Sequence, residues 1–144
     1  MFHKIIMASA VALTFGFGVS TAQADGNKAN VQQYGYKNSA GGGQSGYRNR
    51  LTIHQDGSRN SAISSQHGKR NRAVVGQVGR GNHADTYQNG SRNVVGVGQF
   101  GSGHTAITTQ DGAGNAIGVI QGGRNNSASA TQVGRGNVSV IVQD

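Results

Sequence analysis

Glutamine returns every eleven residues along most of this chain, and asparagine stands five residues after nearly all of these glutamines. A side-chain amide both donates and accepts hydrogen bonds. If equivalent side chains stack about 4.8 Å apart in neighbouring strands, each amide can reach the carbonyl of the next one. The candidate amide ladders are Gln44, Gln55, Gln66, Gln77, Gln88, Gln99, Gln110, Gln121, Gln132 and Gln143, with Asn49, Asn60, Asn71, Asn82, Asn93, Asn115, Asn126 and Asn137.

Arginine forms a second periodic set. Arg48, Arg70 and Arg92 are spaced by twenty-two residues, and Arg50 and Arg72 repeat that spacing two positions further on. Stacked like charges repel one another unless an anion neutralises them. These arginines are therefore a candidate strip for a polyanion, such as lipopolysaccharide, acidic polysaccharide, extracellular DNA or an acidic partner subunit. The alternative interpretation is that they keep the chain soluble and oppose premature assembly.

The composition offers little for catalysis. The chain has no Cys and no Glu, and no Ser, His and Asp residues share a constrained site. We therefore predict no catalytic residues, no cofactor and no metal site, and interpret His54, His67, His83 and His104 as solenoid surface rather than metal ligands. His104 differs, because it stands where the repeat otherwise has Asn. Specific nucleic-acid recognition is not expected, since no reading module or series of stacking aromatic residues is present.

The elements that position these side chains must fit into eleven residues. Every second residue from Asn to Gln is apolar or small, as in Asn49, Leu51, Ile53 and Gln55, and this alternation predicts a β-strand. Gly follows two residues after each repeat Gln from Gln33 to Gln132. We expect the Gly-rich segment between Gln and Asn to be a turn, in which Gly supplies positive φ and Asn tolerates it.

Two such units form one predicted coil of twenty-two residues. The inward positions are bulky in alternate units, as at Leu51 and Ile53, and small in the others, as at Ala62 and Ser64. Two sheets joined by short turns pack closely only if bulky residues face small ones. The sequence thus predicts an all-β fold, a β-solenoid of five 22-residue strand-turn-strand coils with two facing parallel sheets.

The N-terminal residues differ in composition from the repeats. A basic start leads into an apolar run shorter than the ~20 residues of a membrane-spanning helix, and Ala22-Gln23-Ala24 fits a signal-peptidase site. Residues 1–24 are therefore predicted to be a secretory signal peptide. Residues 25–32 would form an N-terminal segment or partial strand, and residues 33–144 a repeat domain of ten 11-residue units. Removing residues 1–24 takes away one Lys and no acid, so the formal charge falls from +8 to +7.

The pattern Gln-x-Gly-x-x-Asn-x-Ala-x-x-x-Gln, as in QDGSRNSAISSQ from Gln55 to Gln66, resembles the curlin repeat of bacterial curli fibre subunits. The resemblance covers essentially the whole chain after residue 24. It implies a structural subunit of an extracellular amyloid fibre that assembles end to end for cell adhesion and biofilm matrix, on the surface of a Gram-negative bacterium. The implied partners are other copies of the chain, a second curlin subunit, and an outer-membrane secretion pore with accessory factors.

Two alternatives to a major fibre subunit are considered. The strongly basic composition of this chain resembles that of the minor curlin, which nucleates fibres, more than that of the major one. A soluble β-solenoid that binds a polyanion or ice is the second alternative, but an ice-binding face needs an outward Thr array, whereas Thr86 and Thr108 point inward by parity. Open sheet edges with no Pro to block them favour a subunit that polymerises.

Overall fold

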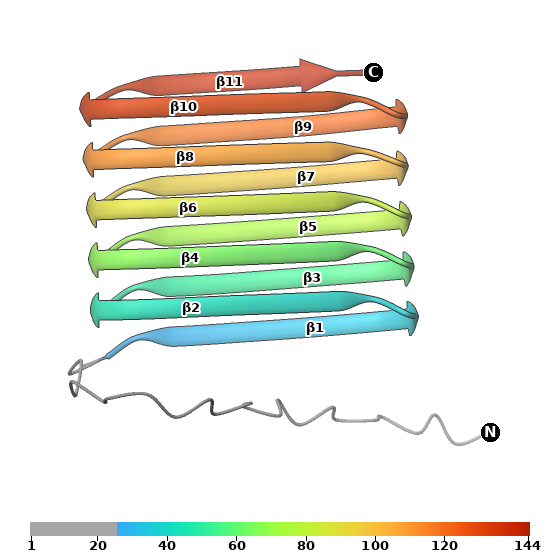
Figure 1. Ribbon diagram of the computed structural model, residues 1–144, viewed down its shortest axis with the longest axis horizontal. Helices are drawn as coiled ribbons and strands as arrows, with labels where there is room; N and C mark the ends of the chain where they lie inside the picture. The colour runs from blue at the N-terminus through green and yellow to red at the C-terminus, as the bar shows by residue number, and fades with distance from the viewer. Residues whose placement is uncertain (1–25) are drawn as a thin grey trace, which may run out of the picture.

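A computed structural model of the chain describes residues 26–144, which form β-strands joined by short corners. The strands stack as a flat solenoid, with successive strands on opposite sides of the stack (Figure 1). In these residues no helix has the length and hydropathy that crossing a bilayer requires. The predicted signal peptide, residues 1–24, lies outside the described residues. The strands are β1 (Lys28–Tyr36), β2 (Ser39–Tyr47), β3 (Arg50–Ser58), β4 (Ser61–Lys69), β5 (Arg72–Arg80), β6 (His83–Ser91), β7 (Val94–Ser102), β8 (Thr105–Ala113), β9 (Ala116–Arg124), β10 (Ser127–Arg135) and β11 (Val138–Gln143).

Odd- and even-numbered strands form two separate parallel sheets. The odd sheet has the order β1-β3-β5-β7-β9-β11, and the even sheet has the order β2-β4-β6-β8-β10. Strands pair in register at a distance of one coil, so that Leu51 lies beside Ala73 and Gln55 beside Gln77. The two facing parallel sheets and the 22-residue coil confirm the predicted β-solenoid.

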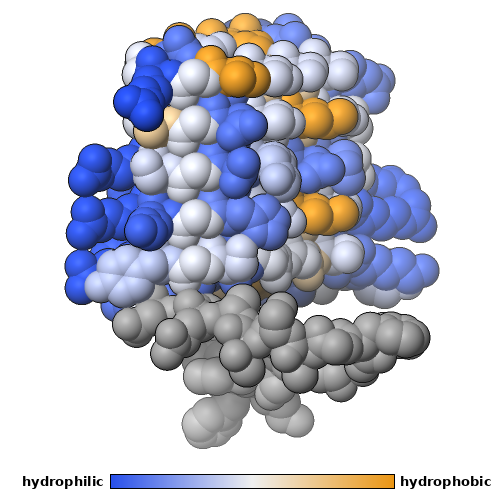
Figure 2. Space-filling model, turned by 60° about the vertical axis from the view of Figure 1, so that its left-hand side comes forward, coloured by the Kyte–Doolittle hydropathy of each residue, from blue (hydrophilic) through white to orange (hydrophobic). Residues whose placement is uncertain are grey.

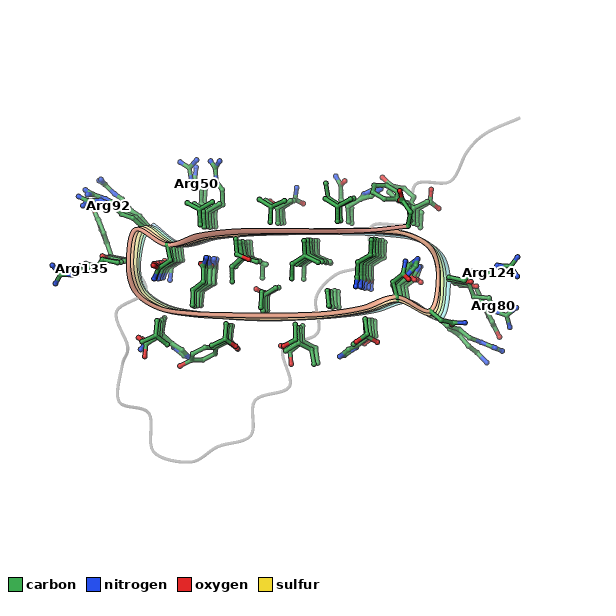
Figure 3. The ribbon with its side chains drawn as sticks, turned by 90° about the horizontal axis from the view of Figure 1, so that it is seen from above. Arg50, Arg80, Arg92, Arg124 and Arg135 are labelled. Carbon is green, nitrogen blue, oxygen red and sulfur yellow. The ribbon has the colours of Figure 1, made fainter. Side chains whose placement is uncertain are left out.

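The core is a single layer of side chains between the two sheets. Figure 3 looks down the stack and shows side chains alternating between the inside and the outside of the flattened ring. The odd sheet contributes the bulky residues Leu51, Ile53, Val75, Val95, Val97, Ile117 and Val119, and the even sheet contributes Ala62, Ala84, Ala106, Ala128 and Ala130. Thr86 and Thr108 are also buried, as their parity predicts. Bulky residues on one sheet thus face small residues on the other.

The strands are longer, and the corners shorter, than the sequence suggested. β3 has nine residues and continues through Gln55 and Gly57, so only Arg59 and Asn60 separate it from β4. At the corner the positive φ belongs to the residue before the repeat Asn, as at Arg59 with φ 57°. The expectation that the repeat Asn takes this conformation was wrong. The Asn side chain points inward at the corner, and the preceding residue makes the bend.

The first strand crosses a predicted boundary. Residues 25–32 were expected to be an N-terminal segment or partial strand, ahead of repeats that begin at residue 33. β1 begins at Lys28, continues past residue 33 without a break, and pairs with β3 from Lys28 opposite Arg50 to Tyr36 opposite Ser58. Its residues are nevertheless exposed, because β1 has only one neighbouring strand among residues 26–144.

Candidate functional site: amide columns and a basic corner

The glutamine side chains form two continuous columns inside the solenoid, one for each sheet. In both columns the Nε2 of one Gln donates to the Oε1 of the Gln one coil later, at 2.6–3.0 Å. The odd column contains Gln33, Gln55, Gln77, Gln99, Gln121 and Gln143, and the even column contains Gln44, Gln66, Gln88, Gln110 and Gln132. From Gln55 to Gln121 every one of these side chains is fully buried.

A second hydrogen bond sets the direction of each column. Gln77 Nε2 also donates to the backbone carbonyl of Ser61 at 2.9 Å, so both of its N–H groups are used. The other described glutamines from Gln44 onward repeat this bond to the first residue of the preceding strand. If the Gln amide were rotated by about 180°, its Oε1 would face that carbonyl oxygen, and two acceptors would oppose each other. Donors therefore point toward β11 and acceptors toward β1 throughout.

The asparagine columns are built differently from the predicted amide ladder. Asn71 Nδ2 donates to the backbone carbonyls of His67 at 2.9 Å and Gly90 at 3.1 Å, and Asn71 Oδ1 accepts the backbone N–H of Asn93 at 3.0 Å. Asn is one methylene shorter than Gln and sits at the corner, so its amide reaches backbone groups of its own coil and the next. The same three bonds occur at Asn49, Asn60, Asn82, Asn93 and Asn115.

The remaining predicted positions lie at the C-terminal end of these columns. Asn126 Nδ2 donates to the Gly122 carbonyl at 2.5 Å, and Asn137 Nδ2 donates to the Val133 carbonyl at 3.0 Å. These two bonds stay within their own coil. The side chains of the interior Asn residues therefore hydrogen-bond to the next coil, whereas those of Asn126 and Asn137 donate only to a carbonyl four residues earlier.

His104 replaces Asn in one column and reproduces most of its bonds. The side chain is fully buried, so the expectation that His104 lies on the solenoid surface was wrong. Its Nδ1 accepts the backbone N–H of Asn126 at 3.2 Å, and its Nε2 lies 3.3 Å from the carbonyl of Phe100. A carbonyl can only accept, so the Nε2 must carry the proton and the Nδ1 must be the acceptor. The imidazole thus acts as a larger version of the Asn amide, and sequence reasoning identified only the interruption of the pattern.

The glycine two residues after each Gln is required by the stacking. Gly79 has φ 122°, and a Cβ at this position would overlap the carbonyl oxygen of Gly101 in the next coil. Both the backbone conformation and the close approach of successive coils therefore exclude a side chain. The sequence signal for this role is the recurrence of Gly at every repeat, although the contact itself is visible only in the stack.

The five predicted arginines all lie at one corner of the solenoid, where each even strand passes into the following odd strand. Arg48, Arg70 and Arg92 occupy one column, and Arg50 and Arg72 occupy a second column at the start of the odd strands. Figure 3 shows Arg92 pointing outward from this corner and Arg50 from the adjoining face. Lys28 and Lys69 extend the set, and we call the seven residues the basic corner: Lys28, Arg48, Arg50, Lys69, Arg70, Arg72 and Arg92.

The backbone of the basic corner is strained. Arg48, Arg70 and Arg92 have φ between 56° and 59°, in the left-handed region, whereas Gly26 and Gly114 occupy equivalent places at the same corner. A side chain in this conformation costs roughly 1–2 kcal/mol per residue. Glycine therefore fits this column better than arginine on conformational grounds. The strain at these positions could not be predicted from the spacing alone.

A shallow groove lies along the basic corner. It is lined by arginines of both columns together with Lys28, Gly26 and Val94. The four Asp residues of the described chain, Asp56, Asp85, Asp111 and Asp144, stand in other columns. The groove is therefore a linear array of cations spaced by one strand separation, about 4.8 Å.

Other polar residues do not assemble into a chemical site in residues 26–144. His54 and His67 each lie beside a tyrosine, at ring distances of 5.6 Å from Tyr34 and 5.7 Å from Tyr87. Within the described part of the chain, no three His, Cys, Asp or Glu side chains come together in a way that could hold a metal ion. The surface in Figure 2 is mostly hydrophilic, with hydrophobic residues in small separate patches.

The structure defines the class of the protein as a repeat protein with in-register parallel coils, each of which packs only against its neighbours. The family model described as Curlin associated repeat matches residues 24–57, 46–79, 57–85 and 79–112, which together extend from residue 24 to residue 112. The chain belongs to the curlin repeat family. No curated protein matches it.

Proposed function

We propose that this protein is a structural subunit of a curli-type extracellular fibre that grows by adding copies end to end. Membership of the curlin repeat family supports a fibre subunit rather than an enzyme. The observation that carries the proposal is the open edge at both ends of the described stack. β1 and β2 pair only with β3 and β4, and β11 and β10 pair only with β9 and β8.

The two ends are complementary in hydrogen bonding. In residues 26–144 the last Gln of each column, Gln132 and Gln143, has an Nε2 facing the β10 and β11 end, and the first, Gln33 and Gln44, has an Oε1 facing the β1 and β2 end. A copy stacked in the same direction would continue both columns. A copy stacked in the opposite direction would bring donors against donors or acceptors against acceptors.

Backbone N–H groups of β11 point to the same end of the stack as the glutamine Nε2 donors. Arg50, Val94 and Ala116 each donate their N–H to the carbonyl of the residue that precedes the odd strand one coil later, at 2.8 Å. Alternate residues of a parallel strand direct their amides the same way. The amides of Val138, Val140 and Val142 therefore point to the open edge, and they are available to a second copy.

The finer function follows from the family. We propose that the fibre acts in cell adhesion and biofilm matrix on the cell surface, that the chain is exported through an outer-membrane pore with accessory factors, and that a second curlin subunit is a partner. The excess of 13 Lys and Arg over 5 Asp keeps the minor, nucleating subunit as the alternative role. The two roles differ in whether this chain or its partner starts the fibre.

The test uses the chain from Asp25 onward, diluted from denaturant and followed by thioflavin fluorescence. We expect a lag, then growth, with preformed fibres removing the lag and a fibre reflection near 4.7–4.8 Å from the strand spacing. A lasting β-rich monomer that preformed fibres do not recruit would contradict the proposal. Adding trace amounts of this chain to a major curlin would shorten that protein's lag only if this chain is the nucleator.

A further inference from the structure

The basic corner has features that fibre growth does not require. Its cations project from the side of the stack, and Lys28 is the one that belongs to an edge strand, β1. Gly114 and Gly136, further along the same corner, show that glycine fits the positions taken by Arg48, Arg70 and Arg92. These three arginines stand where the backbone favours glycine, as do Lys37 and Arg59 at the opposite corner, and what distinguishes the basic corner is its two adjacent rows of cations.

The geometry of the two arginine columns indicates which kind of ligand would fit the basic corner. Arg48, Arg70 and Arg92 form one straight row, Arg50 and Arg72 form a second row two residues away, and a groove lined by both rows lies between them. Guanidinium groups bind planar carboxylates through two parallel hydrogen bonds. The Arg48 guanidinium rests on the Tyr47 ring, 4.6 Å from its centre, which limits its motion. The array fits a straight polymer with one carboxylate in each residue.

We propose that the basic corner binds an extended acidic polysaccharide, a chain of uronic acids that lies along the groove parallel to the stacking direction. Successive sugars of such a chain direct their carboxylates to alternate sides, so that successive sugars meet arginines of alternate rows, each one strand further along the stack. The strand spacing of about 4.8 Å matches the length of one extended sugar residue more closely than the ~3.4 Å rise per phosphate along a DNA strand. Duplex DNA also winds away from a straight row of cations.

The test measures the anisotropy of a labelled ten-residue oligomannuronate titrated with the mature chain, residues 25–144, in physiological salt. The key variant combines Arg48→Gly, Arg70→Gly and Arg92→Gly. The matched control combines Lys37→Gly, Arg59→Gly and Arg124→Ser, which removes three charges from the opposite corner, where Figure 3 shows Arg124. We expect about tenfold weaker binding for the key variant, because each exposed ion pair contributes modestly, and little change for the control.

A third variant separates charge from geometry. This variant combines Arg48→Lys, Arg70→Lys and Arg92→Lys. It keeps every charge, but lysine cannot form two parallel hydrogen bonds to a carboxylate, so we expect an oligomannuronate affinity between those of the wild type and the Gly variant. Equal losses in the Gly variant and its control would show that only net charge matters, and would overturn the proposal. Stronger competition by a DNA duplex of equal total charge would assign the corner to phosphate polymers instead.

The fibre experiment and the binding experiment test different proposals, and either proposal can be contradicted while the other stands. Thioflavin kinetics of the three variants report assembly, and oligomannuronate anisotropy reports the corner whether the chain is monomeric or fibrous. If the arginines only restrain assembly, the Gly variant will assemble faster while the wild type shows no saturable binding, and that result would overturn the polysaccharide site. A loss of fibres with binding retained would contradict the proposed function and leave this inference standing.

Discussion

Glycine and histidine at single positions show how closely the coils approach one another. Gly79 stands where even a methyl group would meet the next coil, while Gly96, in strand β7, has open space around its Cα and no left-handed φ. Only Gly79 stands at a position where Gly recurs in every repeat, and the two glycines have opposite structural demands. His104 shows that the Asn position accepts another residue only when a donor and an acceptor are kept at similar places.

Substituting Gly79→Ala should destabilise the protein severely. The new Cβ would overlap the Gly101 carbonyl and force the two coils apart, and we expect a loss of more than about 4 kcal/mol in the free energy of unfolding, or no folding at all. Gly96→Ala is the control and should change that free energy by less than about 0.5 kcal/mol. Guanidinium unfolding followed by circular dichroism would compare them, and equal effects would refute the stacking role of Gly79.

Substituting His104→Asn should stabilise the protein. Asn can donate to two carbonyls, as Asn71 does, whereas the imidazole makes a single such contact, so we expect a gain of about 0.5–1.5 kcal/mol. His104→Leu should instead cost about 1–3 kcal/mol, because the Asn126 N–H loses its partner. The same unfolding measurement applies. If His104→Asn lowered the free energy of unfolding, the prediction would be wrong, and the neighbouring residues would pack better around the imidazole ring.

The strand with its buried Gln is the unit that repeats at the level of elements. Each interior Gln links its own strand to three others, because it accepts from the previous coil, donates to the next and donates to the facing sheet. Gln99 has all three bonds, to Gln77, Gln121 and the His83 carbonyl. A buried polar column of this kind is stable only while it is complete. Each strand therefore depends on its neighbours for satisfied amides as well as for apolar packing.

Substituting Gln99→Leu tests this dependence. The apolar side chain has a similar volume but leaves a donor of Gln77, the acceptor of Gln121 and the His83 carbonyl without partners. We expect a loss of about 3 kcal/mol or more, since each buried unpaired group costs about 1–3 kcal/mol. Gln143→Leu at the end of the same column should cost roughly a third as much. Equal unfolding midpoints for both variants would show that the column contributes nothing beyond its volume.

At the scale of the whole molecule, the flat stack has a direction. The glutamine donors and the outward amides of β11 all point to one end, so growth by stacked copies must be head to tail. The basic corner occurs on one side and in the first coils only, so a fibre would display it once in every subunit. The proposed assembly and the proposed polysaccharide binding therefore use different faces of one molecule.

Substituting Val140→Pro should block growth at the β11 end. Proline removes an amide that points to the open edge, while Ser139 and Ile141, which pair toward β9, are unchanged. We expect this variant to add to wild-type seeds and then stop further elongation at that end, so that fibres are shorter in electron micrographs. Val140→Ala keeps the amide and should elongate normally. Equal fibre lengths for both variants would exclude the β11 edge as a growth site.

The sequence by itself determined the period, the strand parity and the two-sheet solenoid, because alternation and repeat length depend only on local geometry. It also placed Gln55 and its equivalents inward and the arginines outward. Only the tertiary structure decided the bonds made by the repeat Asn, the left-handed φ at Arg48 and the full extent of β1. These depend on how one coil meets the next, and a contact between residues 22 positions apart takes its exact form only once the coils have stacked.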